Sequence, residues 1–234
     1  METMKSSGGF HFLPTDGPFS GGVAADPGYQ IVRVRAPRYT PLTEGFSIVE
    51  KTVEAEGRPL AALCAMELRI PKPLSRQAFD EFNAGYVAQL QRWGLPVDGR
   101  QPAARTNVAP EIEPPEQPSL HAFCYTVEGV SGRATFVISG APEPPGTQGG
   151  LPAFWGAIAK TLDERMTALG VKWSDVTETQ IYCTRSDHQL FSAQGLARFE
   201  DLVRPGLRWF FSRPPIDSLN LEIDVGGLAR ESWL

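Results

Sequence analysis

The chain has 234 residues, a net charge of −5, 41% hydrophobic residues and 21% charged residues. Such a composition is typical of a globular protein, and the length suits one large or two small domains. The acidic balance argues against a nucleic-acid partner, because proteins that bind nucleic acids usually present basic surfaces. The sequence contains no run of 18 apolar residues, so we expect no membrane span and no membrane partner.

The first residues, Met1 to Gly9, hold one lysine and no apolar stretch, which argues against a secretory signal. The three cysteines, Cys64, Cys124 and Cys183, lie in apolar, strand-like runs without Cys-x-x-Cys spacing. We therefore expect buried free thiols and a cytoplasmic location. The three histidines lack ligand spacing, so we expect no metal site.

Hydrophobic periodicity divides the chain into two series of elements. The first series is predicted as a strand at 29–36, a helix at 43–56, a strand at 63–70, a helix from Ser75 to Gly94 and a strand at 120–127. Serine is a favourable N-cap and glycine a favourable stop, and both support the bounds of the second helix.

The second series repeats this order. It is predicted as a strand at 134–139, a helix at 153–170, a strand at 178–184, a helix at 189–203 and a strand at 219–225. The repetition predicts an old duplication, with one domain at 1–127 and another at 128–234. Helices on one face of a mixed sheet are the simplest α+β packing for this order of elements.

An arginine follows the second helix in each series, where a loop leads into a strand. Arg105 and Arg208 lie 208 − 105 = 103 residues apart. The planar guanidinium makes two parallel hydrogen bonds to a carboxylate and stays charged when partly buried. We therefore consider both arginines as residues that bind the carboxylate of a ligand. A salt bridge within the domain is the alternative for each.

Three stretches resemble the reactive-intermediate deaminase (Rid, YjgF-like) family. They are Gly17 to Val23, Trp173 to Tyr182, and the pattern Pro-x-x-Arg ending at Arg208 with Leu221 to Asp224 beyond it. Within the family, the chain is most similar to the two-domain group of 2-aminomuconate and 2-amino-5-chloromuconate deaminases. The resemblance implies two tandem chorismate-mutase-like (Rid-type) domains, each a mixed sheet backed by two helices on one face. It also implies a homo-oligomer with a trimer-like ring and sites at the clefts between domains.

The resemblance also implies roles for particular residues. Arg105 and Arg208 would hold the carboxylate next to the reacting carbon, and Glu222 would place the attacking water. A solvent-facing strand residue is the alternative for Glu222, because its neighbours alternate with it in hydropathy. His121 stands at the corresponding position of the first half, where it would transfer a proton or lie on the surface.

Two further positions depart from the family pattern. Phe19 stands where many members carry a tyrosine, so it keeps an aromatic wall and loses a hydroxyl. Asn107 stands where a cysteine is frequent, and its amide can hydrogen-bond a ligand. The counterpart of Asn107 in the second half is Phe210, which can only pack. These departures predict one working site and one altered copy.

The predicted function is hydrolytic deamination of an enamine or imine carboxylic acid, similar to 2-aminomuconate, with release of ammonia. An imine carbon is already electrophilic, so we expect no cofactor; orientation and carboxylate neutralisation would suffice. A dicarboxylate would need a second cation, for which Arg69, Arg100 and Arg213 are candidates. A generic 2-imino-acid hydrolase and a non-catalytic protein that binds small carboxylates are the alternatives.

Overall fold

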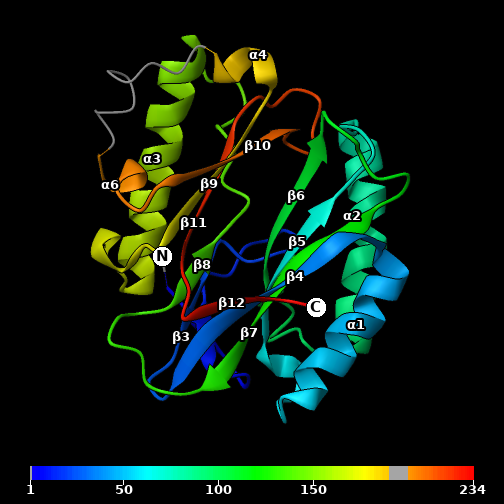
Figure 1. Ribbon diagram of the computed structural model, residues 1–234, viewed down its shortest axis with the longest axis vertical. Coiled ribbons are helices and arrows are strands. Elements are labelled where there is room, and N and C mark those ends of the chain that lie inside the picture. The colour runs from blue at the N-terminus through cyan, green and yellow to red at the C-terminus, as the bar shows by residue number, and fades with distance from the viewer. Residues whose placement is uncertain (1, 190–199) are drawn as a thin grey trace.

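The computed structural model describes residues 2–189 and 200–234 as strands flanked by helices (Figure 1). The first half contains β1 (Met4–Ser6), β2 (Phe10–Phe12), β3 (Val23–Ala25), β4 (Tyr29–Pro41), α1 (Leu42–Ala55), the 3-10 helix η1 (Leu60–Ala62), β5 (Leu63–Arg69), α2 (Arg76–Arg92), β6 (Ala104–Pro110) and β7 (Ser119–Glu128). The second half contains β8 (Phe136–Ile138), α3 (Gly150–Leu169), η2 (Trp173–Asp175), β9 (Glu178–Cys183), α4 (Arg185–His188), α6 (Glu200–Val203), β10 (Leu207–Arg213), β11 (Glu222–Gly227) and β12 (Arg230–Trp233).

Local sequence signals explain most of these bounds. The Ser75 hydroxyl caps α2 by accepting a hydrogen bond from the Ala78 amide at 3.2 Å, which satisfies one of the free amides of the first turn. Gly170 ends α3 with a φ of 71°, a left-handed conformation that glycine adopts without steric cost. The helix predicted at 189–203 falls mostly on 190–199, outside the described residues; Glu200–Val203 are helical as α6.

In the described residues, the strands form one twelve-stranded sheet with the order β1-β2-β3-β8-β11-β9-β10-β6-β5-β7-β4-β12. Each half contains one parallel strand pair, β5–β6 in the first and β9–β10 in the second. The antiparallel pairs are β1–β2, β2–β3, β4–β7 and β5–β7 in the first half and β8–β11 and β9–β11 in the second. One of the places where the halves meet is the antiparallel pair β6–β10, with Pro110 opposite Ser212 and Ala109 opposite Arg213.

The prediction of two tandem Rid-type domains, each with its own sheet, is therefore wrong. β3 of the first half pairs with β8 of the second, and β12 at the C-terminus pairs with β4. Hydrophobic periodicity identifies strands but carries no information about which edges pair. The domain boundary near residue 127 stays a prediction, and strands of each half pair with strands of the other half. The ring-like homo-oligomer and the cytoplasmic location also stay predictions.

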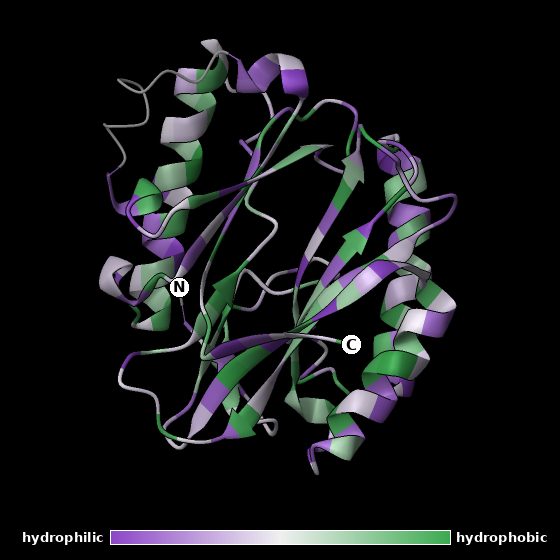
Figure 2. Cartoon of the chain, in the orientation of Figure 1, coloured by the Kyte–Doolittle hydropathy of each residue, from purple (hydrophilic) through white to green (hydrophobic). Residues whose placement is uncertain are grey.

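The helices cover the outer faces of this sheet, with α1 and α2 on one side and α3 on the other (Figure 1). Apolar and polar residues alternate along the central strands (Figure 2), so each strand presents one face to a helix and the other to the interior. Val49, Met66 and Leu90 belong to the cluster under α1 and α2, and Leu162 and Ile223 to the cluster under α3. A third cluster lies between the halves and contains Phe10, Phe12, Ile31, Ala65, Ala104 and Val137.

The three cysteines are free and buried, as the sequence predicts. Within the described part of the chain, no helix combines the length and apolar content that crossing a bilayer requires. No group of three or more potential metal ligands occurs in the same residues.

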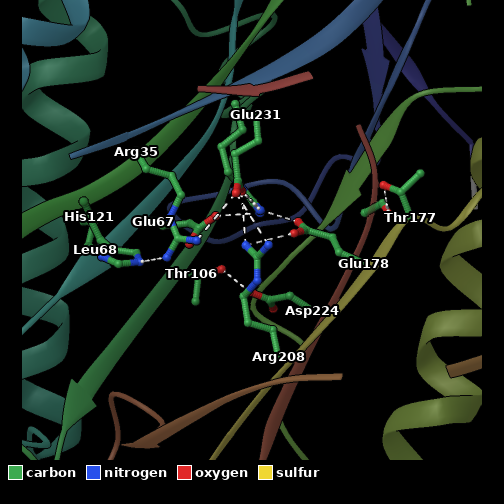
Figure 3. Close-up of polar contacts among 12 residues, drawn as sticks. Arg35, Glu67, Leu68, Thr106, His121, Thr177, Glu178, Arg208, Asp224 and Glu231 are labelled. Carbon is green, nitrogen blue, oxygen red and sulfur yellow. Dashed lines mark hydrogen bonds and ion pairs between the residues drawn. The ribbon is translucent and has the colours of Figure 1, made fainter. Parts of the chain in front are cut away.

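A buried ionic cluster joins the two halves at their interior faces (Figure 3). Arg33 of β4, with a side chain 3% exposed, binds Glu67 of β5 at 2.7 Å, Glu231 of β12 at 3.2 Å and Glu178 of β9. Arg208 of β10 contacts Glu178 at 3.4 Å and Glu231 at 3.1 Å. Burial opposes ionisation of Glu67, but the neighbouring groups Arg33, His121, Arg69 and Arg35, with Arg33 the strongest of them, together outweigh it and lower the pKa of that carboxyl to about 2.

Replacing Arg33 with methionine tests this cluster. Removal of Arg33 leaves the buried Glu67 and Glu178 with only the more distant counter-charges of Arg69 at 3.8 Å and Arg208 at 3.4 Å, so we expect a loss of about 3 kcal/mol of stability. The measurement is the free energy of unfolding in urea. Arg38→Met, at an exposed position of the same strand, is the control and should change stability by less than about 0.5 kcal/mol. Equal stability of the two variants would contradict the role given to Arg33.

Candidate functional site

A cavity of about 240 Å³ lies between α2, β6 and the loops at 17–19, 140–142 and 215–219. Four of the six predicted site residues line it: Phe19, Arg105, Asn107 and Glu222. Pockets for drug-sized ligands occupy about 300–1,000 Å³, so this cavity suits a smaller molecule. A groove of about 620 Å³ runs between α1 and α2, and none of the six residues lines it.

Arg105 is the buried cation of this cavity, with 1% of its surface exposed. Its Nη2 donates to Asn83 Oδ1 at 2.7 Å, and its guanidinium lies over the rings of Phe19 at 4.9 Å and Tyr86 at 4.6 Å. Burial lowers the pKa of Arg105 to about 10, so the side chain stays charged at neutral pH. Its Nε and Nη1 donate to no group in the described residues, and it forms no ion pair there. A buried cation without a counter-ion is costly, and a bound carboxylate would relieve that cost with two hydrogen bonds.

Asn107 adds a neutral polar group beside this cation. It lies two residues after Arg105 on β6, so both side chains project from the same face of the strand. Asn107 is 3% exposed, and its amide oxygen and nitrogen have no hydrogen-bond partner within residues 2–189 and 200–234. A ligand in the cavity would therefore find both a donor and an acceptor at this position.

Glu222 supplies the acid of the cavity. It is 2% exposed, so the alternative of a solvent-facing strand residue is wrong. Its neighbours Leu221 and Ile223 enter the cluster under α3, which turns Glu222 to the interior face. Burial and the nearby carboxyl of Asp224 raise the pKa of Glu222 well above its usual range, against the opposing charges of Arg69 and Arg105. The raised pKa favours the protonated form of Glu222, from which this side chain can donate a proton.

Asp224 holds two walls of the cavity together. It accepts hydrogen bonds from the hydroxyl of Thr106, which lies between Arg105 and Asn107, and from the amide of Gly140 at 3.0 Å. Burial raises the pKa of Asp224 to about 7, although these hydrogen bonds act against the rise. Gly140 has a φ of 64°, and a Cβ there would lie 2.8 Å from the carbonyl oxygen of Arg105. The close approach of β6 to this loop therefore requires glycine.

Arg208 lies outside this cavity, and the strand register gives the reason. Arg105 is paired with Met66, which packs under α1 and α2, so Arg105 faces a helix. Arg208 is paired with Gln180, which lines the interior between the halves. Adjacent residues of a strand project to opposite faces, so a shift of one residue reverses the side chain. The two arginines are not equivalent, and Arg208 holds carboxylates of its own chain, Glu178 and Glu231 (Figure 3).

His121 also lies outside the cavity, in contact with Arg35 and Phe210. Its Nε2 is 3.1 Å from Arg35 Nη2 (Figure 3), and its ring meets Phe210 edge-on at 5.9 Å. Arginine only donates, so Nε2 accepts and the ring is neutral with its proton on Nδ1. Burial and the positive charges of Arg69, Arg35 and Arg33 lower the pKa of His121 to about 2, against the opposing charge of Glu67. The structure thus places His121 in the scaffold, apart from Glu222 and its cavity.

Asn83 and Asp224 were missed by the sequence analysis, and each carried a signal. Asn83 is a polar residue in the apolar stripe of α2, between Phe79 and Tyr86, where a buried amide needs a partner. Asp224 follows Glu222 by two residues on the polar face of one strand, which brings two carboxyls close together.

Comparisons with known proteins agree on one kind of enzyme. The model of a family described as 2-aminomuconate deaminase CnbZ matches residues 2–232. A 2-amino-5-chloromuconate deaminase of Comamonas testosteroni is 36% identical over 246 residues, covering 98% of this chain and 97% of that protein. The predicted likeness to the muconate deaminases is confirmed, whereas the wider placement in the Rid family is not supported.

Solved structures of low identity also align. A chorismatase solved at 1.08 Å aligns with a TM-score of 0.48 and 12% identity, covering 97% of this chain and 89% of its own. A cyanuric acid hydrolase of A. caulinodans aligns with a TM-score of 0.43 and 14% identity, covering 85% and 66%. At these similarities, the two structures say nothing about the chemistry of the cavity.

The contrast between the two arginines can be measured with cis,cis-muconate, a stable dicarboxylate. Hydrogen bonds to a charged group contribute about 1.5–3 kcal/mol, so Arg105→Gln should weaken binding by about 10- to 100-fold. Arg208→Gln should leave the affinity unchanged, because that side chain faces the interior cluster. Titration calorimetry gives both values, with thermal melting to show that each variant is folded. Equal losses in the two variants would contradict the assignment.

The neutral state of His121 predicts a pH effect on stability. Below its ordinary pKa near 6.5, the unfolded chain binds a proton that the folded protein does not, so stability falls as pH falls. The loss is at most about 1.4 kcal/mol per pH unit. From pH 6.5 to 5.0, the native protein should therefore lose up to about 2 kcal/mol more than His121→Gln, in which the amide oxygen still accepts from Arg35. Urea unfolding at the two pH values measures this difference. An equal change in the free energy of unfolding for the native protein and the variant would refute the prediction.

Proposed function

The chain belongs to the 2-aminomuconate deaminase CnbZ family, and from that premise we propose that it hydrolyses its substrate in the cavity between α2 and β6. Family membership makes the chain a deaminase of 2-aminomuconate-like compounds. The location of the reaction, its hydrolytic course and its independence of cofactors are the proposal. One observation carries it: Arg105 and Glu222, a carboxyl whose pKa is raised, line the same buried cavity.

Arg105 binds the carboxylate beside the amino-bearing carbon of the substrate. Its Nε and Nη1 face no acceptor among the described side chains, so both can donate to this carboxylate. The bond neutralises the anion and fixes the enamine next to Glu222. Phe19, 4.9 Å from the guanidinium, closes the cavity on one side and limits the entry of water.

Glu222 then moves protons at the reacting carbons. It gives its proton to the carbon of the enamine double bond that does not carry the nitrogen, which converts the amino-bearing carbon into an iminium carbon. The resulting carboxylate takes a proton from water while the water oxygen bonds to the iminium carbon. The product of this step is a carbinolamine, and Glu222 is protonated again.

Release of ammonia uses the same carboxyl. Glu222 protonates the nitrogen, the carbon–nitrogen bond breaks, and the hydroxyl proton returns to Glu222 as the carbonyl forms. The sum is enamine plus water giving ketone plus ammonia, and the enzyme ends in its starting state. An imine carbon is already electrophilic, so these steps use no metal and no organic cofactor.

Glu222→Gln tests this role because glutamine keeps the shape and the hydrogen bonding but cannot transfer a proton. We expect kcat for ammonia release from 2-aminomuconate to fall by about 10²- to 10⁴-fold. The affinity for cis,cis-muconate should be retained. Glu116→Gln, at an exposed position, is the matched control and should keep full activity.

The pH profile separates a proton donor from a structural residue. Free enzyme is active with Glu222 protonated, so kcat/KM should be full at low pH and fall as pH rises through the raised pKa of this carboxyl. This fall of kcat/KM with rising pH should be absent in Glu222→Gln. Full activity in the variant would overturn the mechanism, whereas carboxylate binding without turnover in the native protein would favour a binding protein.

A further inference from the structure

One stripe of α2 lines the cavity from its mouth to its floor. Arg76, Phe79, Asp80 and Asn83 all face it, at the spacing of residues that share one side of a helix. A helix rises 1.5 Å per residue, so Arg76 and Asn83 lie about 10 Å apart along the axis. Asn83 accepts a hydrogen bond from Arg105 at 2.7 Å, which places the guanidinium of Arg105 at the Asn83 end.

The two ends of the stripe each carry a cation. The side chain of Arg76 is 75% exposed, whereas Arg105 is 1% exposed. They are the basic residues among the described lining of the cavity. One positive charge therefore stands at the mouth and the other at the floor.

This spacing matches a six-carbon dicarboxylate. Each bond adds about 1.2 Å to an extended chain, because three bonds span about 3.6 Å. The five bonds between the terminal carbons then span about 6 Å. A C–O bond of about 1.2 Å and a hydrogen bond of about 2.9 Å at each end bring the greatest span between the donor atoms of the two arginines to about 14 Å. The long, exposed side chain of Arg76 reaches beyond its own helix position and covers the difference.

The cations that the sequence suggested for a second carboxylate lie elsewhere. Arg69 is buried over the rings of Tyr182 and Phe210, and Arg100 is paired with Asp16. Arg213 is exposed at the end of β10. None of these three arginines belongs to the described lining of the cavity.

We propose that Arg76 binds the second carboxylate of the substrate and makes the enzyme prefer dicarboxylic over monocarboxylic enamines. This inference rests on the proposed function of the same cavity. Arg76 contributes to binding and selection and takes no part in proton transfer. The deep carboxylate stays with Arg105, next to Glu222.

Asp80 competes for Arg76 one turn further along the helix. Its Oδ1 lies 3.5 Å from Arg76 Nε, and its side chain is 61% exposed. Exposed pairs of this kind are weak, so a substrate carboxylate can displace Asp80. The acid also repels that carboxylate, and its removal should therefore improve binding.

The test compares 2-aminomuconate with 2-iminobutyrate, which lacks the second carboxylate. Arg76→Gln should raise KM for 2-aminomuconate by about 5- to 10-fold, with kcat little changed and KM for 2-iminobutyrate unchanged. Asp80→Asn should lower KM for 2-aminomuconate by about 2- to 5-fold. Arg92→Gln, at the exposed C-terminal end of the same helix, is the matched control and should change neither value.

An equal rise in KM for both substrates in Arg76→Gln would show a structural effect and overturn the inference, as would no change at all. Calorimetric binding of cis,cis-muconate and of crotonate, a monocarboxylate, repeats the comparison without turnover. If the native protein releases no ammonia from either substrate, the proposed function fails. A selective loss of muconate binding in Arg76→Gln would still support the carboxylate role of Arg76.

Discussion

The ion pairs of Arg33 are the interaction on which the rest of the structure depends. They join β4 and β5 of the first half to β9 and β12 of the second, at the buried interior faces. Direct pairing between β6 and β10 involves only two residues of each strand. Beyond these residues the two strands move apart in space. The cavity forms in the space between them, with Arg105 from one half and Glu222 from the other.

The ionic cluster and the cavity differ in how their charges are paired, and the pKa values of their carboxyls differ accordingly. In the cluster, arginines and glutamates neutralise one another, so the pKa of Glu67 falls to about 2. At the cavity, Glu222 lies near Asp224 and in a buried position, so its pKa rises. The same residue type thus has a lowered pKa in one place and a raised pKa in the other, as its surroundings decide.

The sequence predicted elements and the deep end of the site better than it predicted pairing. Ser75 and the periodicity of α2 located that helix within two residues. The family resemblance singled out Arg105 and Asn107, which lie on one face of β6. The error about Arg208 came from aligning two arginines by position, because facing depends on register with neighbouring strands. Glu231 lies in a short edge strand with little hydrophobic pattern, so nothing in the sequence indicated that it would hold Arg208.

A crystal structure of the protein with cis,cis-muconate is the most direct test of this account. We predict one carboxylate within about 3 Å of Arg105 Nε and Nη1, the carbon chain beside Glu222, and the other carboxylate against Arg76. Muconate bound in the groove between α1 and α2, or at Arg208, with the cavity below Arg76 unfilled, would contradict it.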